Sequence, residues 1–369
     1  MKHIVIDARL YGPKHTGLGR YTKNLLLALK QLPDFKKYKF TLLVYPELLA
    51  EISNDLKDNY QYVPTPLRHY SLAEQIFLPT LLSKLKPDLV HFAHLDKPIF
   101  YFGKSVVTVH DLIRHFSKGS DTTTKNPLFY WLKYAAYLLM TRIIFLSSFL
   151  IVPSNFWRDY IIKKYKYNPQ KIITTYEAVD PNFLKLKHQS SKVPKNYLLY
   201  TGNLYPHKNI EVVLKALRKL PDLKLKIICA RSVFSEKIEI KISTLGLQKQ
   251  VEFLGYVPDE KFSDLYQNAL ALVHPSFLEG FSLTGLEAMA LSCPVIAADA
   301  SCMPEIYEDS VLYFDPKDPS DLVKQINLLR KSPVLREKLI SLGKKQVAKY
   351  SWSKTAKETL NFYTSILKN

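Results

Sequence analysis

The sequence predicts an α/β protein with two domains, each built on a parallel β-sheet that helices cover on both faces. The chain has 369 residues, which exceeds the size of one ordinary domain. In both halves, short apolar segments alternate with segments of helical periodicity, the pattern of parallel sheets. Residues 182–195 are polar, rich in lysine and contain Pro194, which is typical of a linker. We therefore expect one domain over residues 1–182 and another over residues 195–352.

Each expected element is an apolar or periodic segment bounded by turn residues. In the first domain we expect strands at residues 4–6, 40–44, 89–92, 105–109 and 150–152, and helices at 19–31, 72–85 and 128–146. In the second we expect strands at 197–201, 226–230, 251–254, 271–273, 294–297 and 311–314, and helices at 210–219, 259–268 and 320–331. Ligands of parallel sheets bind beyond the carboxyl ends of the strands. Two such domains usually bind their ligand in the cleft between them.

The formal net charge is +19, from 52 lysines and arginines against 33 acidic residues. Lysine is spread along the chain and is not concentrated in a tail. Nucleic acid, an anionic membrane surface and phosphorylated substrates all fit such a charge, as does a lysine-rich coding bias. No Cys/His finger, basic zipper or RNA-binding signature is present, so nucleic acid is not expected as a partner.

The apolar segment at residues 131–153 resembles a membrane span, but Arg142 lies near its middle and Ser147-Ser148 interrupt it. A charge at the centre of a bilayer costs about 3 kcal/mol on insertion scales. We therefore expect a helix followed by a short buried strand. The first residues look like a strand and not like a secretory signal. The three cysteines lack metal-ligand spacing, which favours buried thiols in a soluble, cytoplasmic protein: Cys229, Cys293 and Cys302.

Two loops of the first domain carry residues suited to a ligand. The segment Thr16-Gly-Leu-Gly-Arg-Tyr follows the first strand, and its Gly17 and Gly19 would let the backbone approach a ligand closely. Glycines that only allow the chain to turn are an equally good explanation. His110 and Asp111 follow the strand at 105–109, where a neutral imidazole is able to donate to a sugar hydroxyl or to take a proton. A locally bonded histidine at the end of a strand is the alternative.

Lys208 lies in a loop that begins with Gly202 and leads from the strand at 197–201 into the helix at 210–219. The helix dipole favours anions at this position. A lysine there makes sense if it and the helix both face a diphosphate; a solvated loop lysine is the alternative.

The segment from Glu279 to Glu287 carries the strongest indication of function. It follows a buried strand, contains Gly280, and runs into a helix of small and apolar residues. Backbone N–H groups at such a helix start are suited to a phosphate. Glu279 and Glu287 would then lie near hydroxyl groups of the same ligand. This is the outline of a sugar-nucleotide site.

Taken together and in this order, four motifs resemble those of the group 1 (family 4) retaining glycosyltransferases with the GT-B fold. They are Asp7-Ala-Arg with Thr16-Gly-Leu-Gly-Arg-Tyr, Val109-His-Asp-Leu, Thr201-Gly-Asn-Leu-Tyr-Pro-His-Lys-Asn, and Glu279-Gly-Phe…Leu-Glu287-Ala-Met-Ala. The resemblance covers nearly the whole chain. It implies two Rossmann-like, doubly wound domains facing a central cleft, with the acceptor mainly on the first and the nucleotide-sugar donor on the second. It also implies that a last helix, at about 353–369, crosses back onto the first domain.

The resemblance implies a role for each matching residue. His110 would lie beside the reacting centre, Lys208 would neutralise the diphosphate, and Glu279 would bind the donor sugar, which makes these three the expected catalytic residues. The expected donor-binding residues are Gly17, in the loop after the first strand, together with Gly202, Asn203, Lys208, Glu279, Gly280, Phe281, Ser282, Leu283, Thr284 and, near the ribose, Glu287.

Three positions depart from the family pattern. Many members carry arginine where Asn203 stands, and Ser282 and Gly285 replace the commoner glycine and proline. Arg20, Arg231 and His207 are candidates to compensate for the missing arginine.

The implied activity is transfer of a hexose, with mannose favoured, from a nucleotide-diphosphate sugar such as GDP-mannose or a UDP-sugar to a glycan or lipid-linked glycan, as in polysaccharide biosynthesis. No Asp-x-Asp motif is apparent, so we expect no metal and no other cofactor, and retention without a covalent carboxylate intermediate. A GT-B nucleotide-sugar epimerase and a non-catalytic nucleotide-sugar-binding protein are the alternatives. The aromatic cluster Phe129, Tyr130, Trp131, Tyr134 and Tyr137 either contacts an anionic membrane, at the inner face of the cell membrane, or packs in the core.

Overall fold

The computed structural model describes residues 1–119, 127–186, 196–229, 233–255 and 257–368. The chain divides into two compact units. The first unit comprises Met1–Leu112, Leu128–Glu177 and Ser351–Asn369; the second comprises Ile113–Pro127 and Ala178–Tyr350. Of the expected linker, residues 187–195 lie outside the described residues, and residues 182–186 belong to the second unit.

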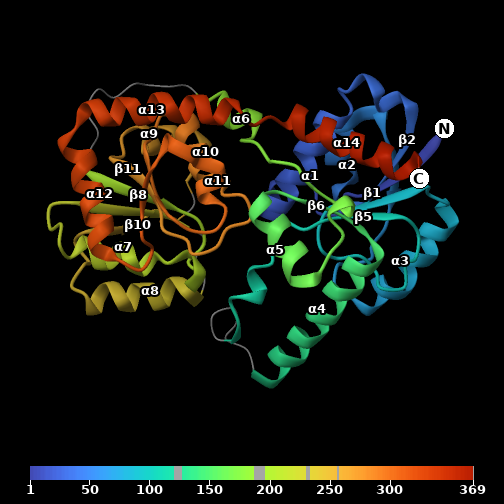
Figure 1. Cartoon of the computed structure of the whole chain (residues 1–369), viewed down its shortest axis with the longest axis horizontal. Helices are drawn as coiled ribbons and strands as arrows, with labels where there is room; N and C mark the ends of the chain where they lie inside the picture. The colour runs from blue at the N-terminus through green and yellow to red at the C-terminus, as the bar shows by residue number, and fades with distance from the viewer. Residues whose placement is uncertain (120–126, 187–195, 230–232, 256, 369) are drawn as a thin grey trace. The chain divides into compact units, whose positions relative to one another are not determined.

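The first unit is built on a parallel sheet of seven strands in the order β3-β2-β1-β4-β5-β6-β7 (Figure 1). Most of these strands are apolar because helices bury both faces of the sheet. The strands are β1 (Lys2–Asp7), β2 (Tyr38–Val44), β3 (Gln61–Pro64), β4 (Leu89–Phe92), β5 (Ser105–Thr108), β6 (Phe149–Val152) and β7 (Ile172–Thr174).

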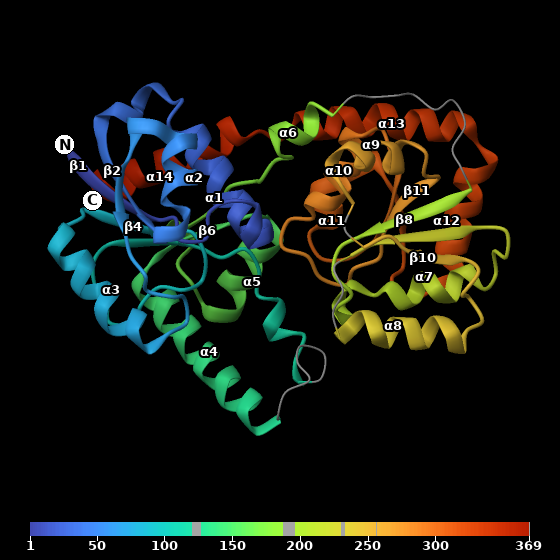
Figure 2. The same cartoon turned by 180° about the vertical axis from the view of Figure 1, so that it is seen from behind.

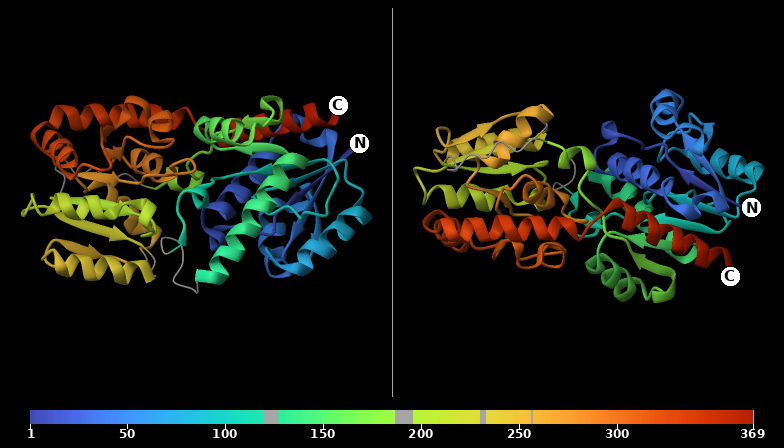
Figure 3. Two further views of the ribbon diagram at one scale, coloured as in Figure 1. Left: turned by 60° about the horizontal axis from the view of Figure 1, so that its bottom comes forward. Right: turned by 90° about the horizontal axis from the view of Figure 1, so that it is seen from above.

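Helices α1 (Thr16–Leu29), α2 (Leu49–Leu56) and α14 (Trp352–Lys368) lie on one face of this sheet, and α3 (Leu72–Leu85), α4 (Pro127–Ser147) and α5 (Asn155–Tyr165) lie on the other (Figures 1 and 2). The last helix, α14, packs along α1 and buries Tyr363, whose hydroxyl contacts His91 Nδ1 at 2.5 Å. Figure 3 shows α14 beside the first unit from two further directions.

The second unit contains a six-stranded parallel sheet in the order β10-β9-β8-β11-β12-β13. Its strands are β8 (Tyr197–Thr201), β9 (Lys224–Ile228), β10 (Val251–Phe253), β11 (Ala271–His274), β12 (Val295–Ala298) and β13 (Leu312–Phe314). Its helices are α6 (Pro181–Leu184), α7 (Ile210–Leu217), α8 (Val233–Thr244), α9 (Asp259–Gln267), α10 (Leu283–Ala290), α11 (Met303–Tyr307), α12 (Pro319–Lys331) and α13 (Pro333–Ala348).

Both sheets have the strand order of a Rossmann fold, in which the winding direction reverses at one point. The reversal lies between β1 and β4 in the first unit and between β8 and β11 in the second. In open parallel sheets, the loops that follow the two strands at this point enclose the ligand site. The topology therefore indicates which loops to inspect in each unit.

The two-unit α/β prediction is confirmed, and every predicted strand is present within a residue or two of its expected bounds in the described part of the chain. Strands β3 and β7 and helices α2, α5, α6, α8 and α13 were not predicted. The apolar segment at 131–153 forms most of α4 and then β6, as expected, and no helix of the described chain has the length and apolarity to span a bilayer. The three cysteines are free and buried.

Candidate active site

In the second unit, two loops meet at the reversal point of the sheet. One follows β8 and ends in the short 3-10 helix η8 (Pro206–Lys208); the other follows β11 and reaches α10. The backbone N–H of Phe277 donates to His207 O at 2.8 Å, which joins the loops directly. The side chain of Asn209 strengthens this junction by donating to Pro275 O at 3.1 Å and to Pro316 O at 2.8 Å.

Lys208 and Glu279 form an ion pair across these loops. The Lys208 ammonium lies 2.8 Å from each oxygen of the Glu279 carboxylate. The lysine side chain is 19% exposed and the glutamate side chain 9%. Burial alone would raise the pKa of Glu279, but the Lys208 ammonium and the His274 ring hold it well below its ordinary value. Lys208 therefore has a fixed anionic partner and is not a solvated loop lysine.

Behind this pair lies a buried chain of hydrogen bonds. His274 Nε2 contacts Glu279 Oε1 at 2.9 Å, and His274 Nδ1 contacts the Tyr307 hydroxyl at 2.8 Å. That hydroxyl donates to Ser282 O at 2.7 Å and accepts from the Gly285 N–H at 3.2 Å. A Cβ on Gly285 would lie 2.3 Å from the Tyr307 oxygen, so this position accepts only glycine while Tyr307 is in place.

Helix α10 begins directly after Ser282, which adopts a left-handed backbone with φ of 75°. A non-glycine residue in this region stores about 1–3 kcal/mol of strain, which explains why glycine suits the position better. The N–H groups of the first helical turn have no partner inside the helix, and that of Gly285 is used by Tyr307. The backbone N–H groups of Leu283 and Thr284 belong to the same turn.

The remaining expected donor residues differ in their surroundings. Gly202 has a φ of 141°, which few other residues adopt. Asn203 is exposed, and its backbone oxygen accepts from the Tyr200 hydroxyl at 2.5 Å. Phe281 is buried and packs edge-on against Tyr350 at 5.5 Å, so only its backbone is available to a ligand. Gly280 lies in the same loop, and Glu287 is half-buried on α10.

Of the three candidates to compensate for the missing arginine, His207 is the one that lies in this loop among the described residues. Arg231 lies outside the described residues, and Arg20 belongs to the first unit. Burial and the neighbouring Lys208 lower the pKa of His207 to about 4, so its imidazole is neutral near pH 7. Among the described residues, Lys208 is therefore the cation of this loop.

In the first unit, Gly17 and Gly19 differ sharply. Gly17 was expected in the loop after the first strand. Helix α1 begins at Thr16, so Gly17 lies in the first turn of that helix instead. A Cβ added to Gly17 would meet nothing within 4 Å, whereas one on Gly19 would lie 2.0 Å from Gly12 O. Gly19 is therefore required by packing, and Gly17 is not.

His110 follows β5 and has partners on both ring nitrogens. Nδ1 lies 3.2 Å from Glu177 Oε1, and Nε2 lies 2.9 Å from Ala93 O. Burial lowers the pKa of His110, but the Glu177 carboxylate outweighs it, so the pKa is raised overall. Two acceptors facing the two nitrogens favour the imidazolium. The neutral, substrate-facing imidazole expected from the sequence requires one of these contacts to be exchanged.

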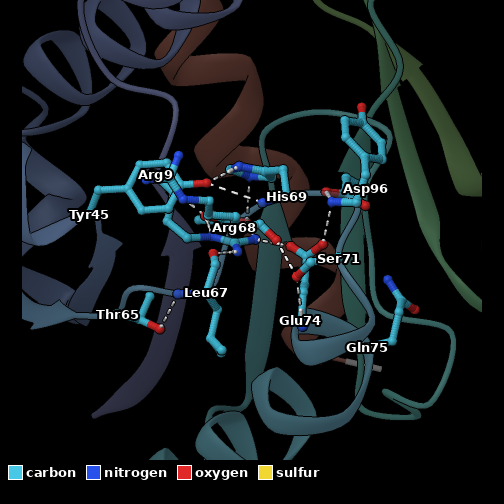
Figure 4. A network of polar contacts seen from close by, with 12 residues as sticks. Arg9, Tyr45, Thr65, Leu67, Arg68, His69, Ser71, Glu74, Gln75 and Asp96 are labelled. Carbon is cyan, nitrogen blue, oxygen red and sulfur yellow. Dashed lines mark hydrogen bonds and ion pairs between the residues drawn. The ribbon is translucent and has the colours of Figure 1, made fainter.

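Sequence reasoning missed a buried polar network at the reversal point of the first unit (Figure 4). Arg9 is fully buried and binds Asp7 Oδ2 at 2.6 Å and Glu74 Oε1 at 2.5 Å. His94 and Asp96 follow β4 beside this group. Burial lowers the pKa of His94 to about 3, and burial together with Glu74 raises that of Asp96 to about 8. The available signal was the position of Asp7 and His94 directly after apolar strands.

Comparison with known families accounts for both units. The sequence matches the family described as Glycosyltransferase Family 4 over residues 15–183 and that described as Glycosyl transferases group 1 over residues 183–346. The O-antigen chain mannosyltransferase RfbU of Salmonella typhimurium is 27% identical over 345 residues, covering 89% of this chain and 92% of the relative. The O-antigen chain mannosyltransferase B of Escherichia coli is 26% identical over 369 residues, covering 94% and 96%.

Solved structures show the same fold. A glycosyltransferase from Rickettsia africae superposes with a TM-score of 0.73 at 17% identity, covering 100% of this chain and 99% of that one. The sucrose-phosphate synthase of Thermosynechococcus elongatus gives 0.74 at 18% identity, with 100% of both chains covered. These comparisons give no support to the epimerase or to the non-catalytic binding protein. The chain is a glycosyltransferase of the GT-B fold and belongs to family 4, group 1.

Proposed function

We propose that this glycosyltransferase moves a hexose from a nucleotide-diphosphate sugar to a glycan or lipid-linked glycan acceptor. The observation that carries the proposal is the Lys208–Glu279 pair, placed at the reversal point of the second sheet and followed directly by the start of α10. A cation and a helix N-terminus side by side suit a diphosphate.

The donor would bind along the two loops of the second unit. Its diphosphate would take the Lys208 ammonium and the N–H groups of Leu283 and Thr284. Two buried atoms support a ligand here, because His207 Nδ1 and Ser276 Oγ have no hydrogen-bond partner among the described residues. Polar atoms buried without a partner are costly, and a bound donor would satisfy them.

Glu279 would accept hydroxyl groups of the donor sugar and hold the lysine in place, and Glu287, farther along α10, would reach the ribose. Both Glu279 oxygens already contact Lys208, and one of them contacts His274. A carboxylate committed to two cationic or polar partners is a poor nucleophile. This supports retention by attack on the same face of the sugar, without a covalent carboxylate intermediate.

Breaking the bond between sugar and phosphate leaves negative charge on the diphosphate. Lys208 and the first turn of α10 would stabilise that charge, each donor contributing roughly 3 kcal/mol to lowering the barrier. We infer that the transfer step needs no divalent ion at the diphosphate, since the protein supplies its own cation.

The acceptor would bind mainly on the first unit. Gly17, with open space where a side chain would be, would let the first turn of α1 approach the donor phosphates. His110 would act near the reacting centre after exchanging its contact with Ala93 O.

The names of the relatives favour mannose as the transferred sugar. Both full-length relatives are O-antigen chain mannosyltransferases, which makes GDP-mannose the first donor to test and UDP-sugars the second.

Helix α4 would place the enzyme on an anionic membrane. Trp131 is 50% exposed, Tyr130 stacks on Tyr134, and the rings of Trp131 and Tyr137 pack against Tyr134. This arrangement supports a contact surface more than core packing; the side chain of Phe129 lies outside the described residues. Further exposed apolar side chains are Leu132, Leu139 and Leu146, at 62%, 61% and 77%. Lys133 and Arg142, on the same helix, suit anionic headgroups.

Vesicle co-sedimentation tests the membrane contact. Binding to vesicles with anionic lipid is expected to fall at least fivefold in the double variant Trp131→Ser and Leu139→Ser. Ile240→Ser, which removes an equally exposed apolar side chain from the second unit, is the control. Binding that is the same with neutral lipid, or in all three proteins, would count against the contact.

A thermal-shift screen against GDP-mannose, UDP-glucose and UDP-N-acetylglucosamine tests the donor. The fitting donor is expected to raise the melting temperature of the wild type and not that of Lys208→Met or Glu279→Gln. Lys219→Met, which removes a lysine whose ammonium donates to the exposed Ser320, is the control. Product analysis with the fitting donor then separates transfer to an acceptor from epimerisation.

A further inference from the structure

Three side chains of the types that commonly ligate metals lie close together at the carboxyl edge of the first sheet. His69 comes from the loop after β3, and His94 and Asp96 come from the loop after β4. One ligand atom of each lies within 4.8 Å of the others. His94 is 6% exposed and Asp96 is fully buried. The glycosyl-transfer chemistry derived above uses none of them.

The atoms that face one another in this group have no hydrogen-bond partners. His69 Nε2, both nitrogens of His94 and Asp96 Oδ1 are buried and lack a hydrogen-bond partner among the described residues, and Asp7 Oδ2 lies 3.7 Å from His69 Nε2. Polar atoms that are buried without a hydrogen-bond partner destabilise the folded protein. Their separation is too small to admit a sugar ring, so the occupant that satisfies them has the size of one atom.

The surrounding contacts orient these atoms. The Tyr45 hydroxyl contacts His69 Nδ1 at 2.7 Å (Figure 4), which leaves Nε2 as the nitrogen available to an ion. The N–H of Tyr70 donates to Asp96 Oδ2 at 3.1 Å, which leaves Oδ1 to face it. A hydrogen bond from Asp96 N to His94 O, 2.8 Å long, closes a tight turn that holds the two side chains together.

The local charge favours a cation. Glu74 and Asp7 share the single guanidinium of Arg9, and Asp96 adds a third carboxyl group, which accepts from the same Tyr70 N–H as Glu74. Within this group, three carboxyl groups face one permanent positive charge, so a bound cation would allow all three to ionise. Buried carboxylates require a compensating positive charge.

We propose that His69, His94 and Asp96 bind one divalent transition-metal ion, with Zn²⁺ as the best fit. Two imidazoles and a carboxylate form a ligand set that borderline cations prefer over Mg²⁺ or Ca²⁺. Bond lengths of about 2.0–2.2 Å place tetrahedral ligands about 3.4 Å apart, so binding draws the two loops together by little more than 1 Å. The fourth position is left for water.

Such an ion would cross-link the loops after β3 and β4 and stiffen the edge of the sheet where the first unit presents its loops. Its three ligands all belong to the first unit, whereas Lys208 belongs to the second. The inference therefore holds whichever donor the enzyme uses.

Metal titration of the full-length protein tests the proposal. Chelator-treated protein is titrated with Zn²⁺ against a chromophoric competitor, and Co²⁺ is added separately to record its visible absorption. One tight equivalent of Zn²⁺ is expected, and Co²⁺ is expected to give a tetrahedral or five-coordinate spectrum. His94→Gln and Asp96→Asn are each expected to weaken Zn²⁺ binding at least 100-fold and to abolish the Co²⁺ spectrum.

His3→Gln is the matched control, since it removes a buried histidine of the same unit that is bonded to Thr41 instead. It is expected to bind Zn²⁺ like the wild type. The melting temperatures of the metal-free variants check that they fold; Asp96→Asn keeps the shape of the side chain. Failure of the wild type to bind one equivalent, or equal binding by wild type and Asp96→Asn, would overturn the proposal and assign the unpaired atoms to ordered water.

Discussion

Replacing Lys208 by methionine is expected to reduce stability and activity for two separable reasons. The substitution leaves the Glu279 carboxylate, whose side chain is 9% exposed, without its ammonium partner. Breaking a buried ion pair costs about 3–5 kcal/mol. We expect a value of about 3 kcal/mol, because the lysine is partly exposed and His274 still contacts Glu279 at 2.9 Å. For a unit of this size that is a fall of roughly 6–12 °C in melting temperature.

The double variant Lys208→Met with Glu279→Gln separates the two effects. It removes the uncompensated charge and is expected to recover most of the lost stability in thermal unfolding. Its kcat is expected to stay about 10²–10³-fold below the wild-type value, because the leaving diphosphate still lacks its cation. Recovery of kcat together with stability would refute the assignment of Lys208 to the diphosphate.

The same pair gives a pH dependence with a defined sign. The pKa of Glu279 is lowered in the folded protein, so its contribution to stability is present above the unfolded value of about 4.3 and is lost as the pH falls toward the folded value. The stability difference between wild type and Lys208→Met is therefore expected at pH 7 and should shrink below about pH 4. A difference that does not depend on pH would contradict the ion pair as its source.

The remaining predictions concern the first unit and the metal requirement. Gly17→Ala is expected to keep or slightly raise the melting temperature and to raise the donor KM at least tenfold. Gly19→Ala should lose stability, because its Cβ would lie 2.0 Å from Gly12 O. An unchanged donor KM in Gly17→Ala would contradict the proposed approach of Gly17 to the phosphates. Glu177→Gln is expected to cost more stability at pH 6 than at pH 9. Because the pKa of His110 is raised in the folded protein, the His110–Glu177 pair stabilises the fold below the ordinary pKa of about 6.5, and this stabilisation is lost as the pH rises through the folded value. Equal costs at both pH values would count against the pair. Adding Mg²⁺ or Mn²⁺ to chelator-treated enzyme is expected to change kcat less than twofold, and a larger recovery would refute metal-independent transfer.

The fold could be predicted from the sequence where the apolar residues of an element form a continuous run or follow the period of a helix. The strands at residues 89–92 and 197–201 and the helix at 72–85 match the structure to the residue. The missed strands, Gln61–Pro64 and Ile172–Thr174, are the two edges of the first sheet and are short and only partly buried. Edge strands need no continuous apolar sequence, so hydrophobic pattern does not reveal them. Helix α13 was missed because its buried residues include Gly343 and Gln346, which contribute nothing to an apolar helical pattern.

The site could be predicted as a set of loops but not as a set of contacts. Lys208 and Glu279 are 71 residues apart in the chain and meet because β8 lies beside β11, a neighbourhood that sequence spacing does not encode. The partners on both nitrogens of His110 and the role of Tyr307 against Gly285 depend on packing in the same way. Motif resemblance located the residues, and tertiary structure determined what they touch.

The return of α14 to the first unit has a consequence for synthesis of the protein. All residues of the second unit precede Ser351, whereas the first unit lacks a buried helix until the final residues have been translated. On the ribosome, the second unit therefore has its whole sequence available before the first unit does. The half that starts first is completed last.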